Sequence, residues 1–486
     1  MKKVVIVGSG TAGLSCAAMM KNYWGDRVDI SLYYDSSSKN IAVGESTTPI
    51  IRLLLDHLGV STEQFFREFR NNASIKLGIN FKNWIPNTEY FHGFGQIPRR
   101  NLNTSAVYSI PQDKFNGGTN YNESTTTIPK LPFNQFDFAL HIDTKEFSEY
   151  ITNKLKGRIN LVDDLVVGVR VNPECNKIVN IECRDSGIIE ADLFVDASGF
   201  SAVLFKHLNP KWNDISDSLP LDRAIPQQIP NNSNELPSYT VAEATENGWI
   251  WKLPIGDRFG TGYIYSSRFT SDEEAREKYN DWLLTNHNEE LQTDRIIRYN
   301  PGYYDDYWIG NCLAIGLSSG FVEPLESTGI QIILSQVQEF MTINSTLNNL
   351  EYNRVIINKA NRKLYEEIID FICLHYNTNR TDSEFWRYMT ANKVDWVKNF
   401  DEKCKEEFLD ARTCHREKTF WILDSYVQIT KGLNMSDNQS IKNFLDYKWD
   451  GRKIWNEMKD EHRILEVEKR RIKWISHRKV LDSFTK

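Results

Sequence analysis

The chain has 486 residues, of which 40% are hydrophobic and 12% aromatic, including 13 Trp. That length allows two or more packed layers and two subdomains, and the aromatic content is typical of enzymes that handle flat ligands, although aromatic side chains also fill ordinary cores. The formal net charge of −7, without any long basic block, argues against nucleic-acid binding.

Seven cysteines are scattered along the chain without metal-type pairing, and this odd, dispersed set points to a reducing cytosol. A strand-like run begins almost at Met1, which leaves no room for a signal peptide, and no apolar run reaches membrane-spanning length. The sequence therefore predicts a soluble, cytoplasmic protein that has no membrane segment and holds no metal.

Residues 3–20 predict a buried strand, a tight glycine turn and a helix. In this pattern Gly8 forms the turn, Gly10 lets the backbone approach a pyrophosphate, and Gly13 permits close packing of the helix on the strand. A bare GxGxxG is weak evidence, but this one has a strand before it and a helix after it. A dinucleotide site is therefore favoured over a glycine turn without a ligand.

Further turns follow the next predicted elements. A second strand, residues 28–34, ends at Asp35, an acid that could bind the ribose hydroxyls of an adenine nucleotide or simply face solvent. Residues 43–49, Val-Gly-Glu-Ser-Thr-Thr-Pro, precede a helix and suggest a ligand-facing turn. Residues 191–200 predict another buried strand that runs into a glycine turn at Gly199, a second nucleotide contact of the kind that flavin folds place far from the first.

Lys76 stands between apolar residues in a stretch that predicts a strand, residues 74–84. If its apolar neighbours face one way, Lys76 faces the other, towards a cavity or towards solvent. A single lysine is more often solvated, so the local pattern favours a surface position. Shortly afterwards His92 and Phe94 lie on a glycine-containing aromatic run, where each could line a pocket or belong to the core.

The middle of the chain contains a low-complexity passage and then a mostly β region. Residues 101–135 are rich in Asn, Thr, Ser, Tyr and Pro, and are either disordered or, as we favour, a lid. In the β region Trp249 and Trp251 stand two apart on one predicted strand and so share a face. Two adjacent indoles could form the wall of a cavity or the core of a sandwich.

A third glycine-rich turn, residues 316–329, lies between an apolar run that predicts a buried strand and a periodic run, residues 330–341, that predicts a helix. Ser327 and Thr328 are the predicted caps of that helix. A helix start presents N–H groups and a partial positive charge, which suits an anion. Locally, Glu326 is best explained as a capping acid in solvent.

Three motifs, in this order, together resemble the flavin-dependent tryptophan halogenases. Residues 8–13, Gly-Ser-Gly-Thr-Ala-Gly, resemble the FAD fingerprint of that family. Residues 248–254, Gly-Trp-Ile-Trp-Lys-Leu-Pro, resemble its Trp-x-Trp-x-Ile-Pro signature with Leu253 in place of Ile, and residues 321–329, Phe-Val-Glu-Pro-Leu-Glu-Ser-Thr-Gly, resemble its second signature. The resemblance covers most of residues 1 to about 390.

The resemblance implies an α/β fold: a Rossmann-like FAD-binding domain of the glutathione-reductase type with an interleaved β-sheet, and a mainly helical C-terminal substrate region. We assign residues 1–330 to the first part, with a lid loop at about 85–135, and residues 331–486 to the second. The charged, amphipathic segment 454–484 is expected to form a helix packed on the surface.

The chemistry that the resemblance implies starts from reduced FAD, which a separate flavin reductase supplies. Reaction with O₂ gives a flavin hydroperoxide, and halide (chloride, bromide or iodide) converts it to hypohalous acid, which travels along a tunnel to an electron-rich aromatic or heteroaromatic substrate. The absence of a second dinucleotide fingerprint agrees with this division of labour. The expected partners are thus a small aromatic substrate and the reductase, with a homodimer or higher homo-oligomer left open.

Four residues match the family's reaction centre. Lys76 matches the lysine that hydrogen-bonds hypohalous acid or forms a haloamine, and both roles stay open. Glu326 matches the carboxylate that orients the electrophile and accepts the arenium proton, and a nearby Lys76 would hold it ionised. Thr328 and Gly329 match the backbone halide site.

Other positions match the family's walls and its cofactor site. Trp249 and Trp251 match the wall that separates flavin from substrate, and His92 and Phe94 match the lining of the aromatic pocket. The cofactor-binding residues that the resemblance implies are Gly8, Gly10, Thr11, Ala12, Gly13, Asp35, Val43, Gly44, Glu45, Ser46, Gly199, Gly316 and Ser327.

The sequence departs from the family in two places. Members that bind tryptophan carry a Tyr-Tyr pair followed by Glu and Trp, and this pattern does not occur between residues 409 and 486, where Tyr447, Trp449 and Trp455 lack the pair and the spacing. Another indole, a phenol or a heteroaromatic is therefore at least as good a candidate as free tryptophan. Asp35 lies one position from the expected ribose acid, and the Asn-, Lys- and Ile-rich composition would suit an AT-rich genome, such as that of a phage or a marine bacterium.

Two other functions stay open on the residues alone. A flavin-dependent monooxygenase or reductase would share the dinucleotide fingerprint, but paired indoles would keep an arene away from the flavin and so argue against it. A non-catalytic flavoprotein is the third hypothesis, which the presence of both Lys76 and Glu326 disfavours. The halogenase hypothesis requires these two side chains to converge in one chamber.

Overall fold

The structure is a computed structural model that describes residues 1–37, 44–94, 126–130, 132–347, 351–407, 409, 420–435, 438–447, 452–453, 456 and 474–484. The chain forms two compact units, each assembled from three stretches. Unit 1 comprises Met1–Ala73, Ala139–Asp222 and Arg298–Glu366, and unit 2 comprises Ser74–Phe138, Arg223–Ile297 and Glu367–Lys486. The single division at residue 330 suggested by the sequence falls inside helix α6 (Thr328–Ile343).

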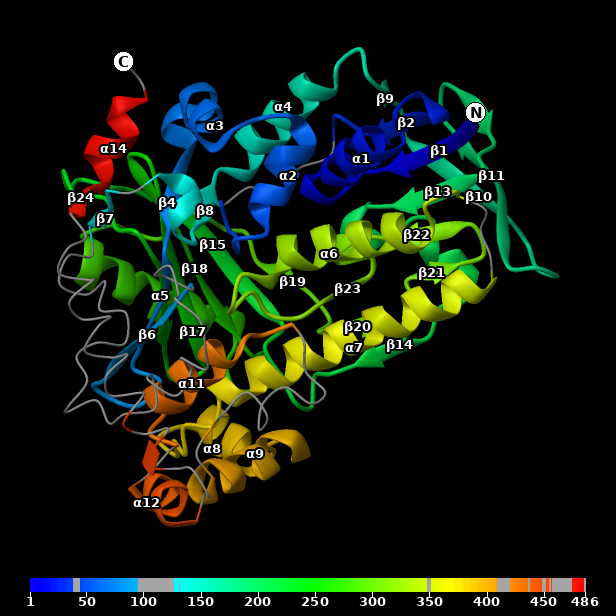
Figure 1. Ribbon diagram of the computed structural model, residues 1–486. Helices are drawn as coiled ribbons and strands as arrows, with labels where there is room; N and C mark the ends of the chain where they lie inside the picture. The colour runs from blue at the N-terminus through cyan, green and yellow to red at the C-terminus, as the bar shows by residue number, and fades with distance from the viewer. Residues whose placement is uncertain are drawn as a thin grey trace. The chain divides into compact units, whose positions relative to one another are not determined.

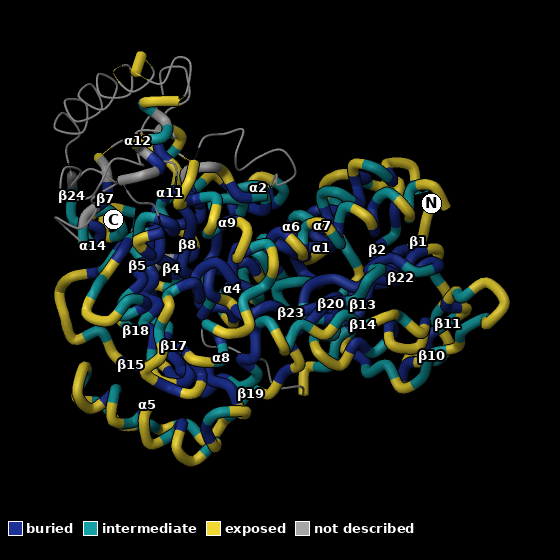
Figure 2. Tube along the Cα trace, turned by 90° about the horizontal axis from the view of Figure 1, so that it is seen from below, coloured by how far each residue is buried: buried dark blue, intermediate teal, exposed yellow. Residues whose placement is uncertain are grey.

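Unit 1 is built on a six-stranded sheet. In spatial order the sheet contains β21 (Trp308–Ile309), β22 (Cys312–Ala314), β13 (Leu193–Asp196), β1 (Lys2–Val7), β2 (Val28–Tyr34) and β9 (Asn160–Asp163). Neighbouring strands are parallel except β21 and β22. Parallel strands covered on both faces are apolar along most of their length, and β1 accordingly is buried from Val4 onwards (Figure 2). The sheet confirms the predicted α/β, Rossmann-like class.

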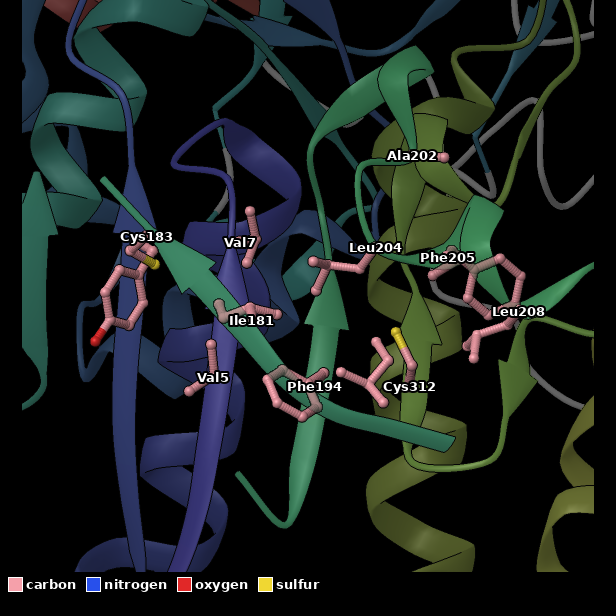
Figure 3. Close-up of a cluster of buried hydrophobic side chains, with 13 residues drawn as sticks. Val5, Val7, Ile181, Cys183, Phe194, Ala202, Leu204, Phe205, Leu208 and Cys312 are labelled. Atoms are coloured by element: carbon pink, nitrogen blue, oxygen red, sulfur yellow. The ribbon is translucent and has the colours of Figure 1, made fainter. Parts of the chain in front are cut away.

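One face of this sheet packs on a second, three-stranded sheet. The second sheet consists of β10 (Val166–Asn172), β11 (Lys177–Cys183) and β12 (Gly187–Ile189). Val5 and Val7 of β1 lie in one buried cluster with Ile181 of β11 and Phe194 of β13 (Figure 3). Because side chains alternate along a strand, Val4 and Ile6 turn to the other face.

The helices of unit 1 are α1 (Thr11–Trp24), α2 (Ile51–Leu58), α3 (Thr62–Phe69), α4 (Thr144–Leu155), α6 and the first part of α7 (Glu351–His375). Helix α1 packs against α2, α4 and α6. The Trp24 indole donates a 2.8 Å hydrogen bond to the Ser345 carbonyl oxygen, which fixes the end of α1 beside the end of α6. The helix predicted at residues 330–341 and the strand predicted at 28–34 are both confirmed.

Unit 2 is built on a seven-stranded sheet. In spatial order the sheet contains β19 (Ile297–Arg298), β15 (Arg223–Pro230), β18 (Arg258–Tyr265), β17 (Gly248–Ile255), β16 (Thr240–Ala244), β5 (Gly78–Lys82) and β6 (Glu89–Gly93). From β15 to β6 the neighbours are antiparallel, except β16 and β5, which are parallel. Helix α5 (Asp272–His287) begins with a capping box formed by Ser271 and Glu274 and buries Tyr279 against the sheet.

The C-terminal part of unit 2 is mainly helical, as predicted. Its helices include α8 (Glu384–Ala391), α9 (Asp395–Glu406), α11 (Leu423–Gly432) and α12 (Asn438–Tyr447). Among the residues that the structure describes, every helix is too short or too polar to cross a bilayer. Residues 95–125 and 131 of the predicted lid, and Val43 of the predicted cofactor site, lie outside the described residues.

The prediction of one surface helix at residues 454–484 is wrong in the part that the structure describes. Strand β24 (Trp474–Ser476) pairs antiparallel with β7 (Thr127–Pro129), and the short helix α14 (His477–Ser483) follows it (Figure 1). The hydrophobic pattern cannot reveal this pairing, because the partner strand lies about 350 residues earlier and its backbone supplies the hydrogen bonds. His477, at the junction, is completely buried.

Candidate active site

The first glycine turn of unit 1 has the geometry of a dinucleotide-binding turn. Gly8 has a φ of +115°, and a Cβ there would lie 2.2 Å from the Ala197 carbonyl oxygen, whereas a Cβ on Gly13 would lie 1.9 Å from the Gly8 carbonyl oxygen. Gly10 is the N-cap of α1, whose first turn contains no acidic residue, and no described heavy atom lies within 4 Å of a Cβ built on it. The start of α1 is thus shaped for a pyrophosphate, which fits FAD.

The second turn, after β13, is held by Asp196. This fully buried carboxylate accepts hydrogen bonds from the backbone N–H groups of Leu204 at 2.7 Å and Phe205 at 2.8 Å. The Ser318 hydroxyl lies 3.1 Å from the Asp196 carboxylate and 3.0 Å from the carbonyl oxygen of Gly199. Asp196 therefore ties the turn at Gly199 to the third turn, a role that no sequence motif predicts.

The third turn, after β22, reaches the first. A Cβ on Gly316 would lie 2.9 Å from the Ala12 Cβ at the start of α1. Strands β1, β13 and β22 are neighbours and parallel, so all three turns lie at the carboxyl edge of the sheet, where open α/β sheets bind their ligands. Three of the predicted cofactor segments are thereby brought together.

A buried polar network connects the third turn to helices α6 and α7. Gln336 of α6 donates to the Ser319 hydroxyl at 3.0 Å and to Asn361 Oδ1 at 2.9 Å, and the Tyr365 hydroxyl lies 3.0 Å from that of Ser319. These hydrogen bonds fix the Ser319 hydroxyl of the turn relative to α6 and α7. Gln336 stands within the apolar face of a helix, which was the only signal in the sequence that could have identified it.

Two more predicted cofactor segments lie elsewhere in unit 1. Asp35 directly follows β2, and hydrogen bonds from the hydroxyl and N–H of Ser37, at 2.6 and 3.0 Å, hold the pKa of its carboxyl below the usual value. Glu45 and Ser46 form β3 (Glu45–Ser46), which pairs with β8 (Ala139–Ile142). Burial raises the pKa of Glu45 to about 7, so this side chain carries little charge in mildly acidic solution.

The start of α6 partly agrees with its prediction. Helix α6 begins at Thr328 with Ser327 as N-cap, as expected, but Ser327 has a left-handed φ of +61° and its side chain forms no capping hydrogen bond. A capping side chain normally requires an extended backbone at that position. Glu326 is 3% exposed rather than solvated. A Cβ on Gly329 would meet no described atom within 4 Å, so an anion has space beside this helix start.

Lys76 is completely buried in unit 2, which contradicts the surface position favoured by its local pattern. It ends β4 (Ala73–Lys76), and its Nζ lies 5.3 Å from the centroid of the Phe94 ring. Leu77 donates its N–H to the Ser238 carbonyl oxygen at 2.7 Å and accepts from the Phe94 N–H at 3.1 Å. An ammonium group is rarely placed in such surroundings without a function or a partner.

His92, another predicted pocket residue of unit 2, lies in an aromatic cluster. The His92 ring is 5.8 Å from that of Phe371 and 6.2 Å from that of Trp421, and those two rings stack with centroids 4.1 Å apart. The Gly93 N–H, next to His92, donates to Gln428 of α11 at 2.8 Å. Phe371 and Trp421 are far from His92 in sequence, and no sequence pattern marks them.

The paired indoles stand on one face of β17, as predicted. Trp249 is 2% exposed. Trp251 lies against Gly262 of β18, where a Cβ would come within 2.1 Å of the indole ring. Gly262 therefore makes room for this indole. Lys76 and both indoles belong to unit 2, whereas Glu326 and Thr328 belong to unit 1, and their meeting in one chamber stays a prediction.

The parallel sheet, its glycine-rich strand–turn–helix and the converging turns define a dinucleotide-binding α/β protein. The model of the tryptophan halogenase family matches residues 3–446. The chain is 33% identical over 430 residues to tryptophan 7-halogenase RebH of Lentzea aerocolonigenes, with 80% of this chain and 78% of that protein covered. It is 31% identical over 433 residues to 7-chloro-L-tryptophan 6-halogenase KtzR of Kutzneria sp. (strain 744), covering 79% and 81%.

Among solved structures, the tryptophan 6-halogenase SttH of Streptomyces toxytricini matches with a TM-score of 0.84 and 28% identity, over 96% of this chain and 97% of that one. The chain therefore belongs to the tryptophan halogenase family. It is an oxidoreductase, a flavin-dependent halogenase.

Replacing Gly10 with alanine is expected to raise the dissociation constant for FAD by at least about tenfold, because the methyl group occupies the space needed by the pyrophosphate. The thermal midpoint of the protein without FAD should stay unchanged, since no described atom contacts a Cβ there. The matched variant Gly13→Ala should lower both FAD affinity and the thermal midpoint, because its Cβ meets the Gly8 carbonyl. Fluorescence titration measures the affinity for FAD, and calorimetry measures the thermal midpoint. Wild-type affinity for FAD in Gly10→Ala would refute this pyrophosphate site.

Proposed function

We propose that the protein halogenates an electron-rich aromatic or heteroaromatic substrate, using reduced FAD, O₂ and halide to generate hypohalous acid. Bound reduced FAD supplies the electrons with which O₂ is activated. The observation that carries the proposal is the complete burial of Lys76, which the family resemblance had marked as the residue that receives the oxidised halogen. A lysine that was simply solvated would have removed this support.

Lys76 has two chemical roles open to it. As an ammonium it donates a hydrogen bond that polarises the halogen–oxygen bond and makes the halogen more electrophilic. As a neutral amine it attacks the halogen of hypohalous acid, the halogen–oxygen bond breaks with release of water, and the lysine carries the halogen as a haloamine. The Phe94 ring at 5.3 Å attracts the cationic form through its electron-rich face, which supports the first role.

Glu326 is proposed as the base that accepts the proton from the arenium intermediate. Glu326 is 3% exposed, so little water competes for the proton. Thr328 and Gly329 are proposed to bind halide through the start of α6, where the side chain of the N-cap Ser327 forms no capping hydrogen bond. Trp249 and Trp251 are proposed to keep the substrate away from the flavin.

The relatives guide the choice of substrate only in part. RebH and KtzR are by name halogenases of tryptophan and 7-chloro-L-tryptophan. Between residues 409 and 486 this chain lacks the Tyr-Tyr pair with following Glu and Trp that tryptophan-binding members of the family carry. We therefore propose another indole, a phenol or a heteroaromatic at least as readily as free tryptophan.

A separate flavin reductase and a cytosolic location complete the proposal. Among the described residues no disulfide joins the six cysteines, and five of the six are buried. Reduced thiols are the rule in the cytosol, where a reductase can deliver reduced FAD.

The proposal is tested by supplying the full-length protein with a flavin reductase, a nicotinamide cofactor, FAD, O₂ and bromide, and screening a panel of indoles, phenols and azoles by mass spectrometry. A product with the paired bromine isotopes is the expected result. A gain of one oxygen mass without bromine would instead identify a monooxygenase. Flavin turnover without any modified arene across the panel would count against both.

A further inference from the structure

We propose that His477, near the C-terminal end of the chain, is a positioning residue that fixes the backbone of Lys76, so that the segment formed by β24 and α14 is part of the frame of the halogenating site. This inference rests on the role proposed above for Lys76. On this proposal, the stretch that was predicted to form a surface helix helps to position Lys76.

The His477 imidazole bridges two backbone segments. Its ring is completely buried, its Nε2 lies 2.9 Å from the Ile75 backbone nitrogen and its Nδ1 lies 3.1 Å from the Pro237 carbonyl oxygen. A backbone N–H can only donate and a carbonyl oxygen can only accept, so Nε2 is the acceptor and Nδ1 carries the proton. Burial lowers the pKa of His477 to about 4, which keeps the ring in this neutral form at neutral pH.

These contacts flank Lys76. The residue before it, Ile75, donates to His477, and the residue after it, Leu77, donates to the Ser238 carbonyl oxygen at 2.7 Å. Because His477 itself bonds to Pro237, both ends of the short stretch around Lys76 are fixed to the same segment of chain. Positioning of this kind matters for catalysis, since a displacement of about 1 Å can reduce a rate about 10²-fold.

The imidazole is in turn held by its own segment. The backbone N–H of His477 donates to the Thr126 carbonyl oxygen at 2.8 Å, and this hydrogen bond continues the pairing of β24 with β7 (Figure 1). The Arg478 guanidinium donates to the Gly256 carbonyl oxygen, between β17 and β18, at 3.0 Å. The segment is therefore anchored on both sides of the ring, and the ring transmits that anchorage to Ile75.

Two variants of the full-length protein separate the two hydrogen bonds of the ring. In His477→Gln an amide oxygen reaches the position of Nε2 and can still accept from Ile75. In His477→Asn the shorter amide reaches only the position of Nδ1, so it keeps the bond to Pro237 and loses the acceptor for Ile75. Lys479→Ala, an exposed residue of the same helix, is the matched control.

Hydrogen exchange of the Ile75 amide, measured without flavin or substrate, reports the contact itself. It should be at least about tenfold faster in His477→Asn and close to wild type in His477→Gln and Lys479→Ala. The yield of halogenated product per flavin oxidised should fall at least about tenfold in His477→Asn alone, at unchanged FAD affinity. Wild-type exchange at Ile75 in His477→Asn would overturn the inference, as would fast exchange accompanied by a wild-type yield.

Lys76→Ala, assayed in parallel, separates this inference from the proposed function. If Lys76→Ala retains its product yield, the role of Lys76 fails, whereas the exchange of the Ile75 amide still decides whether His477 fixes this backbone. Should His477→Asn not fold, Arg478→Ala takes its place, because it loosens the same segment without touching the ring. Faster exchange at Ile75 with a lower yield is then expected, and no change in either would overturn the inference.

Discussion

Replacement of Lys76 by methionine is expected to reduce halogenated product by at least ~10²-fold, the order of loss seen when one donor to a reacting group is removed. Methionine has a similar length and suits a fully buried, apolar position, so the fold should tolerate it. FAD affinity and the rate of flavin reoxidation should stay at the wild-type level, because the three nucleotide turns belong to unit 1 and Lys76 to unit 2. Product analysis and stopped-flow absorbance together measure the two effects.

Two further lysine variants make that test specific. Lys82→Met changes a half-buried lysine of β5, six positions further along the chain, and should leave the product yield unchanged. Lys76→Arg keeps a cation that cannot become a neutral nucleophile. Substantial activity in Lys76→Arg would support the hydrogen-bonding role. Loss of activity in both Lys76→Met and Lys76→Arg would support the haloamine role. Product formation by Lys76→Met at the wild-type rate would remove Lys76 from the mechanism.

The nucleotide-binding half of the site could be predicted because its determinants are local. Gly8 adopts a positive φ, Gly10 leaves open space beside the backbone, and Gly13 allows close contact with the carbonyl of Gly8. Each of these requirements is local to the turn. The strand before these glycines and the helix after them can be recognised from the hydrophobic periodicity of their own residues. The helix at 330–341 was found for the same reason.

The surroundings of Lys76 could not be predicted, because they come from distant parts of the chain. Alternation along a strand indicates which side chains share a face, but it does not tell whether the second face is open to water. Here that face is closed, with Phe94 beside the amine and His477 bonded to the preceding residue. The same limit applies to Asp196 and Gln336, whose partners lie on other elements.

Glu326→Gln is expected to slow formation of the halogenated product by about 10²-fold or more, the contribution typical of a positioned general base. Glutamine keeps the size and the hydrogen-bonding capacity of the side chain while removing its ability to take a proton. Proton loss from the arenium intermediate should then limit the rate. With a substrate deuterated at the halogenated carbon, the variant should show a primary isotope effect that is small or absent in the wild-type protein.

The neighbouring Glu323 provides a matched control for this isotope test. It lies in the same turn as Glu326 and is equally buried, at 1% against 3% exposed, so Glu323→Gln removes one carboxylate from the same surroundings. If general-base catalysis explains the effect, Glu323→Gln shows no isotope effect even where its stability or rate is changed. An isotope effect in both variants, or in neither, would mean that Glu326 does not accept the proton, and the proposed reaction would lose its base.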